Sequence, residues 1–147
     1  MQTFRPMVRI TVIKALMAVA LCVLVTTPAA AQVLQVKGQT LYVPVYSHIY
    51  SGNRERPTYL AATVSIRNTD PSHPIQVLAA DYYDTDGKHI GQYADKPITL
   101  APMASTRFVV KESDKAGGSG ANFIVLWQSQ TPVNPPLVEG IMVTTAS

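Results

Sequence analysis

The sequence predicts an all-β protein, an antiparallel β-sandwich of the immunoglobulin-like type with about seven to eight short strands. Two observations lead to this prediction. Beyond residue 31, short runs of alternating apolar and polar residues are separated by clusters of Gly, Pro, Asn and Asp. The same part of the chain contains no segment in which apolar residues recur at the 3.6-residue period of a helix.

The clearest strand signals lie in the middle of the chain. Residues 60–67 alternate strictly, so one face of this strand should be buried and the other wet. Asn68-Thr69-Asp70-Pro71 ends the strand, and residues 75–83 form a second β-rich run. Asp86-Gly87 predicts a two-residue type I′ turn, because glycine tolerates the positive φ that this turn requires. A return strand should therefore start at His89.

On the N-terminal side, residues 41–50 are expected to form one strand. Because Pro44 cannot donate a backbone hydrogen bond, this strand should lie at a sheet edge or hold a bulge. A polar loop is expected at residues 51–57.

On the C-terminal side, residues 123–127 are apolar on both faces, which predicts a central strand covered on both sides. The three prolines within residues 131–136 should exclude regular structure there. Further strands are expected at residues 98–100, 106–110 and 137–144.

The N-terminal residues 1–31 are expected to be an export signal. Three basic residues precede an apolar run of only 11 residues, and small residues follow up to Ala31. The run is shorter than the roughly 18 residues that a membrane-spanning helix needs, so we expect no permanent membrane anchor. Cleavage near Ala31/Gln32 would leave residues 32–147 as a single β-sandwich domain, with its core between residues 39 and 145, in the periplasm or outside the cell.

Removing this signal changes the charge and the cysteine content. Of 12 Lys and Arg residues, three lie in the signal, and the remaining nine balance the nine acidic residues. A domain without net charge offers no basic patch, so we expect no nucleic-acid binding. Cys22 is the only cysteine, and it lies in the signal. Disulfides, thiolate chemistry and cysteine-based zinc sites are therefore not expected in the domain.

The first candidate binding surface is aromatic. Tyr42, Tyr46, His48 and Tyr50 share one side of the expected strand at residues 41–50. Together they would offer stacking area and hydroxyl groups to a glycan or a protein. Alternatively, cross-strand aromatic pairing, the N-terminal segment or a second copy of the chain covers this face.

The second candidate is the glycine-rich loop around Ser119. Gly118-Ser119-Gly120-Ala121 is close to the nucleophile elbow of hydrolases, but Ala121 replaces the last glycine and no helix pattern follows. A flexible loop is therefore the favoured interpretation, in which backbone amides next to Asn122 form a nest for an anion. The alternative is a hydrolase that uses Ser119 with Asp114 and one of two histidines, His48 or His89.

Metal binding is a further alternative. Asp81, Asp84 and Asp86 alternate as in a calcium loop, but the remaining ligands of such a loop are missing, which favours a solvated hairpin turn. The three histidines, His48, His73 and His89, have no metal-ligand spacing. Asp81 lies in an apolar run and, if buried, is expected to pair with Arg67 or His48. We expect no cofactor.

Several longer segments resemble one bacterial family, the domain of unknown function 3124 (DUF3124), whose members are small exported proteins. The resemblance covers nearly the whole of residues 32–147 and implies nothing about activity. Less specifically, the order of strands and turns resembles the small β-sandwich transducer of a bacterial sensory rhodopsin, which implies oligomerisation and a protein partner. The segments that carry the family resemblance are LYVPVYSHIY (41–50), TVSIRNTDP (63–71), Tyr82-Tyr83-Asp84 with Asp86-Gly87, TLAP (99–102), Glu112-Ser113-Asp114 and GGSGANF (117–123).

Together these observations predict an exported binding or assembly module of the bacterial cell envelope rather than an enzyme. Its partner is expected to be a protein, a glycan or further copies of the chain. A periplasmic hydrolase using Ser119 and a metal-binding module remain the alternatives. The candidate binding residues are Tyr42, Tyr46, His48, Tyr50, Ser119 and Asn122.

Overall fold

A computed structural model describes residues 34–53 and 55–144. The expected export signal at residues 1–31 lies outside them. The chain divides into Met1–Gln32 and Val33–Ser147, and every described residue belongs to the second unit. Within the described part of the chain there are ten strands and no helix. The strands are β1 (Val36–Pro44), β2 (His48–Ser51), β3 (Arg56–Tyr59), β4 (Ala61–Arg67), β5 (Ile75–Tyr83), β6 (His89–Gln92), β7 (Ile98–Leu100), β8 (Ser105–Val110), β9 (Asn122–Val133) and β10 (Leu137–Val143).

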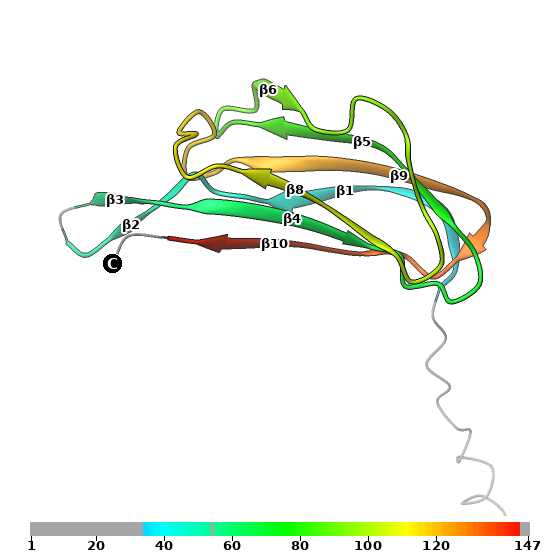
Figure 1. The fold of residues 1–147 in the computed structure, drawn as a ribbon. Coiled ribbons are helices and arrows are strands. Elements are labelled where there is room, and N and C mark those ends of the chain that lie inside the picture. The colour runs from blue at the N-terminus through cyan, green and yellow to red at the C-terminus, as the bar shows by residue number, and fades with distance from the viewer. Residues whose placement is uncertain (1–33, 54, 145–147) are drawn as a thin grey trace, which may run out of the picture. The chain divides into compact units, whose positions relative to one another are not determined.

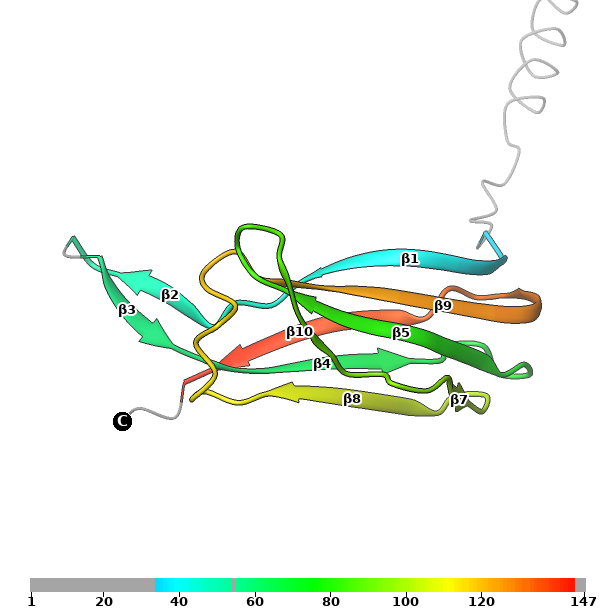
Figure 2. The same ribbon diagram turned by 90° about the horizontal axis from the view of Figure 1, so that it is seen from above.

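The strands form two main sheets and one hairpin. The larger sheet has five strands in the order β1-β9-β5-β6, with β7 pairing a second stretch of β5. The smaller sheet has three strands in the order β10-β4-β8. The β2–β3 hairpin extends from one end of the two sheets (Figures 1 and 2). Every pairing is antiparallel, so the predicted antiparallel β-sandwich is confirmed.

The core lies between the two main sheets and is filled by alternate residues of each strand. In β4 the alternation predicted from the sequence is present, because Ala62, Val64 and Ile66 are all buried. From the larger sheet, Tyr82 stacks on Phe123 with ring centroids 4.9 Å apart and an interplanar angle of 26°. Other large buried side chains of the larger sheet are Ile75, Val77, Val125, Trp127 and Val133.

Most strand positions agree with the sequence prediction. The expected strands at residues 75–83 and 98–100 are β5 and β7 with the same bounds. β4, β8 and β10 each differ from their expected bounds by one residue at one end. These strands are bounded by clear turn residues, which explains the agreement.

The prediction of one strand across residues 41–50 was wrong, and this is one reason why the strand count rises above eight. The chain leaves the sheet after Pro44, because the Val45 and Ser47 amides donate instead to the carbonyl oxygens of Ala121 and Gly118, both at 2.9 Å. A new strand, β2, starts at His48 and pairs with β3. Part of the polar loop expected at residues 51–57 is therefore a β-hairpin.

The prediction for β9 was too short. The strand continues through Pro132 to Val133, although three prolines occupy residues 131–136. In the β1–β9 ladder, Val36 pairs with Val133, and Gly38 pairs with Gln128. Two residues of β1 thus span five residues of β9, so Pro132 lies in a bulge without a ladder partner. β9 is central as predicted, but Leu126 is 38% exposed, so only one of its faces is fully covered.

The β5–β6 turn also differs from its predicted type. The Gly87 amide donates to the Asp84 carbonyl at 3.1 Å, so the turn is centred on Thr85-Asp86 and not on Asp86-Gly87. Gly87 follows with φ +81°, whereas Asp86 does not have a positive φ. This is the arrangement of a longer hairpin loop with glycine in the left-handed position, not of a type I′ turn.

Candidate functional site

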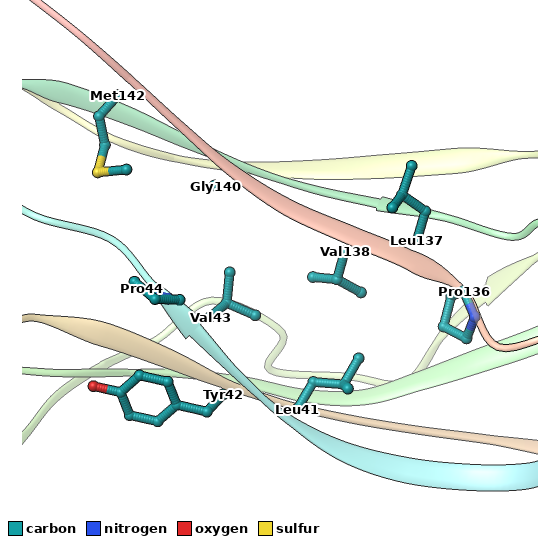
Figure 3. Close-up of a pocket in the computed structure, with 9 residues that line it drawn as sticks. All are labelled: Leu41, Tyr42, Val43, Pro44, Pro136, Leu137, Val138, Gly140 and Met142. Carbon is teal, nitrogen blue, oxygen red and sulfur yellow. The ribbon is translucent and has the colours of Figure 1, made fainter.

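The most distinctive surface feature is a groove between two open sheet edges. β1 pairs only with β9, and β10 pairs only with β4, so each strand has an edge without a strand neighbour in the described structure. Between them lies a groove of about 430 Å³. Figure 3 shows the residues that line it, which are Leu41, Tyr42, Val43, Pro44, Pro136, Leu137, Val138, Gly140 and Met142.

The two edges are held together at one place by close backbone packing. A Cβ atom on Gly140 would lie 2.7 Å from the Pro44 carbonyl oxygen, so only glycine allows β10 to approach β1 this closely. Next to this contact, the Tyr46 amide donates to Met142 Sδ at 3.2 Å. These contacts fix the positions of both edges relative to each other.

The groove opens toward the hydrophobic core. The side chains of Leu41, Val43 and Val138 lie between the ribbons of β1 and β10 (Figure 3). Val43 is buried, while Leu41 and Val138 are partly buried and pack against the core. The floor of the groove is thus continuous with the interior of the sandwich.

The chemical character of the groove is apolar and uncharged. Among its lining side chains, only that of Tyr42 carries a hydroxyl, an amide or a charge. Tyr42 is 63% exposed and Leu137 is 51% exposed, so two large side chains stand free at the rim. This lining suits an apolar occupant and offers little to hold an ion or a strongly polar group.

The structure separates the four residues of the predicted aromatic face. Tyr42 lies on β1 at the groove, Tyr46 lies in the connection to β2, and His48 and Tyr50 lie on β2. The His48 ring makes edge contacts with Tyr50 and with Tyr59, at centroid distances of 5.1 and 5.9 Å. The expected single surface is therefore divided, and a binding role for each residue stays a prediction.

The Ser119 loop is held by neighbouring segments, in contrast to the flexible loop expected from its glycines. The Gly117 carbonyl accepts hydrogen bonds from the Thr85 amide at 2.9 Å and from its hydroxyl at 3.0 Å. The Gly120 amide donates to the same hydroxyl at 3.0 Å, so it is already used and not free for an anion. Ser119 itself is partly exposed, whereas Asn122 is buried at the start of β9.

Gly117 is required by the packing of Tyr82. A Cβ atom at this position would overlap the Tyr82 hydroxyl and lie 2.7 Å from both Tyr82 Cζ and Ala121 Cβ. The Tyr82 hydroxyl lies 3.2 Å from Ser47 Oγ, and burial raises the pKa of Tyr82. The loop, the connection after β1 and the core thus meet at this tyrosine.

The hydrolase alternative receives no support from this geometry. In the described residues, no hydrogen bond joins Ser119 to His48, His89 or Asp114. His89 Nε2 lies 3.7 Å from Asp81 Oδ1 instead, and Asp114 accepts a hydrogen bond from the Ala116 amide. No base is therefore positioned to activate the serine.

Asp81 is only partly buried and contacts neither of its expected partners. Asp81 pairs with His89, while Arg67 pairs with Glu139 through an Nη2–Oε1 contact of 3.1 Å. Asp84 accepts hydrogen bonds from the amides of Asp86 and Lys88, as a solvated hairpin turn requires. Across residues 34–53 and 55–144, no group of three or more His, Cys, Asp or Glu side chains is arranged to hold a metal ion.

A polar cluster after β4 connects three segments. The buried Asn68 side chain donates to the carbonyl oxygens of His73, Leu100 and Ala101 at 2.9, 3.3 and 3.0 Å. Its Oδ1 accepts from the Asp70 amide at 3.0 Å. Because the side chain satisfies backbone groups of two loops, it fixes both loops against the end of the sandwich.

Asp70 is the acidic residue of this polar cluster, and its pKa is clearly shifted. Hydrogen bonds lower its pKa from 3.8 to about 2, with the Ser72 amide contributing most and the amides of Asn134 and His73 adding to it. The His73 ring also lies within 3.3 Å of the carboxylate through Nδ1. The carboxylate is therefore a structural acceptor rather than a group poised for proton transfer.

A comparison with protein-family models identifies the family of this chain. The model of a family described as "Protein of unknown function (DUF3124)" matches residues 38–147. The chain belongs to the DUF3124 family. The matched range contains the groove, the polar cluster and the Ser119 loop.

Two further comparisons add little to the DUF3124 assignment. No curated protein matches the chain. Among solved structures, the chain is similar to the Anabaena sensory rhodopsin transducer at 16% sequence identity and a TM-score of 0.37, covering 76% of this chain and 100% of that one. Within the described part of this DUF3124 chain, we find no helix that is long and apolar enough to span a membrane.

The family segments noted in the sequence have structural roles in this DUF3124 chain. TVSIRNTDP supplies β4 and the polar cluster, and TLAP supplies the carbonyl oxygens that Asn68 binds. GGSGANF supplies Gly117, which packs under Tyr82. These three segments maintain the fold, whereas the segment LYVPVYSHIY supplies the β1 side of the groove.

Half of the groove was missed by sequence reasoning. Pro136 ends a proline-rich stretch and Leu137 and Val138 follow it, and nothing in their pattern indicates that they lie opposite Tyr42. The only local signal was Gly140, since a glycine inside a strand often marks close backbone approach. Its partner, Pro44, cannot be identified without the topology.

Proposed function

We propose that this DUF3124 chain is a binding module of the bacterial cell envelope, which holds an extended, uncharged segment of a partner protein in the groove between β1 and β10. The cell-envelope location, periplasmic or secreted, rests on the expected export signal at residues 1–31. The proposed binding role rests on the structure of the groove.

The observation that carries the proposal is that two open strand edges lie on either side of an apolar groove. An edge strand presents backbone N–H and C=O groups that a further extended segment can bind. Recognition by strand addition uses those groups for affinity and side-chain pockets for specificity. Here the β10 edge supplies the backbone groups, and the space beside Leu41, Val43 and Val138 supplies the apolar pocket.

The chemistry of the lining favours a protein segment over a glycan. A glycan presents many hydroxyl groups, which need hydrogen-bonding side chains in addition to an aromatic platform. Tyr42 provides a platform, but no other lining side chain carries a hydroxyl, an amide or a charge. An apolar strand needs none of these, because its polar groups are on the backbone.

The proposal can be tested with a displayed library of random ten-residue peptides, selected against the protein produced from its full sequence. The expected result is enrichment of uncharged peptides with apolar residues at alternate positions. The Leu137→Asp variant should bind the enriched peptides at least about 10-fold more weakly, because the peptide would bury an unpaired carboxylate.

The matched control is Ile49→Asp, which makes a similar apolar-to-acidic change on an exposed residue of β2, outside the groove. It should leave the peptide affinity unchanged. Enrichment of charged peptides, or equal binding by both variants, would exclude the groove as the site. A glycan array that yields a ligand competing at Leu137 would also overturn the proposal.

A further inference from the structure

The outer face of the three-stranded sheet carries a second candidate surface. Its rows are defined by strand register, because residues directly opposite each other point to the same side of the sheet. Ile141 of β10 lies opposite Thr63 of β4, which lies opposite Val109 of β8. Ile141 and Val109 are 49% and 50% exposed, so this row is apolar and open.

The next row along the strands is charged at its two ends. Glu139 of β10 lies opposite Ser65 of β4, which lies opposite Arg107 of β8. An acidic side chain thus stands on one edge strand and a basic side chain on the other, with a small residue between them. Arg67, also on β4, donates from Nε and Nη2 to one oxygen of Glu139, Oε1, so the carboxylate already has one basic partner within its own chain.

We propose that this face binds the same face of a second copy of the chain. The two copies are related by a two-fold axis that runs parallel to β4, between the three-stranded sheet of one copy and that of the other. Such an axis brings β10 of one copy over β8 of the other. Glu139 then faces the second copy's Arg107, and Ile141 faces the second copy's Val109. Because the axis acts on both copies equally, each contact is made twice.

A second copy is the occupant that the charge pattern fits. The acidic and basic ends of the Glu139–Ser65–Arg107 row lie on opposite sides of β4, so the row is complementary to itself after the two-fold rotation. The adjacent apolar row is also matched, since it brings aliphatic side chains together from both copies. The small Ser65 and Thr63 lie on the axis, where the two sheets must approach most closely.

The test is a pair of charge reversals measured by sedimentation over a dilution series, using protein produced from the full sequence. The unchanged protein should form a dimer. Arg107→Glu places two acidic residues opposite each other, and Glu139→Arg places two basic residues opposite each other. Each single variant should therefore dimerise at least about 10-fold more weakly.

The decisive step is mixing the two single variants in equal amounts. In a mixed pair, the native Glu139 and Arg107 face each other at one contact, and the two reversed side chains, again of opposite charge, face each other at the other. Dimers should therefore form again between unlike chains, and the doubly reversed protein should dimerise with itself. Neither recovery is expected if the single variants had simply lost their fold, and their melting temperatures check this directly.

The matched control is Lys88→Glu, which reverses a charge in the exposed β5–β6 turn and should leave the dimer intact. A monomeric unchanged protein would overturn the inference. So would a dimer that is insensitive to the single reversals, or single variants that stay monomeric when mixed. The groove is tested by peptide binding and this face by dimerisation, so a monomeric protein would leave the groove proposal untouched.

Discussion

Replacing Gly117 with alanine tests the packing that joins the Ser119 loop to the core. The new Cβ atom would overlap the Tyr82 hydroxyl and lie 2.7 Å from Tyr82 Cζ and Ala121 Cβ. Tyr82 is only 1% exposed and is stacked on Phe123, so it cannot move aside without disturbing the core. The loop must therefore shift, which would also strain its bonds to Thr85.

The cost can be estimated from overpacking of buried sites, which destabilises proteins by about 1 to 3 kcal/mol. Because a rigid neighbour is overlapped here, we expect the upper end, about 3 kcal/mol. For a domain of this size, that corresponds to a melting temperature lowered by roughly 12 °C. Thermal and urea unfolding followed by circular dichroism measure both quantities.

Gly87→Ala is the matched control for the Gly117→Ala substitution. Gly87 has φ +81° but no atom within 4 Å of the position that an alanine methyl would take, so an alanine there is strained without being crowded. The expected cost is about 1 kcal/mol. If Gly117→Ala proves no more destabilising than Gly87→Ala, the proposed packing of the loop under Tyr82 is incorrect.

Two further predictions concern the polar cluster after β4. Asn68→Ala should lower the free energy of unfolding by about 3 kcal/mol, because backbone carbonyl oxygens of two loops lose their donor. The control Asn53→Ala, on the exposed hairpin, should change the free energy of unfolding by less than about 0.5 kcal/mol. Urea unfolding of both variants measures the difference. Asp70 has a folded-state pKa of about 2, below 3.8, so its ionised form stabilises the fold above pH 4, and this contribution is lost as the pH falls from 4 toward 2. The melting temperature of Asp70→Asn should accordingly lie below that of the unchanged protein at pH 7 and approach it at pH 2, and a difference that does not depend on pH would contradict the assigned role.

Local patterns in the sequence were sufficient to place most strands. The alternation in residues 60–67 identified both the strand and its buried face, because a half-buried strand leaves a period of two. The bounds of β5 and β7 were also readable, since turn residues flank them. These features depend only on neighbouring residues.

The errors arose where distant segments decide the structure. The split after Pro44 depends on the Ala121 and Gly118 carbonyl oxygens, which capture the amides of Val45 and Ser47. The extension of β9 through Pro132 depends on a bulge opposite β1. Neither partner can be inferred from the local sequence.

The candidate site was predictable only in part for the same reason. Tyr42 was identified as an exposed aromatic on an edge strand, and the structure places it at the rim of the groove. Its grouping with Tyr50 assumed one continuous strand, which the chain does not form. The opposite wall, which includes Leu137, is formed by β10. Most of the described chain separates β10 from β1 in the sequence.

The most direct test of the groove is photocrosslinking in the living bacterium, with Tyr42 and Leu137 replaced one at a time by p-benzoylphenylalanine and Lys88 replaced as the control. The account predicts that positions 42 and 137 crosslink to the same segment of one partner protein. Mass spectrometry should show that this segment is uncharged and apolar at alternate positions, and position 88 should not capture it. Crosslinks to sugar or to unrelated segments, capture of only a second copy of the chain at both positions, or no crosslinks above the control would contradict the account.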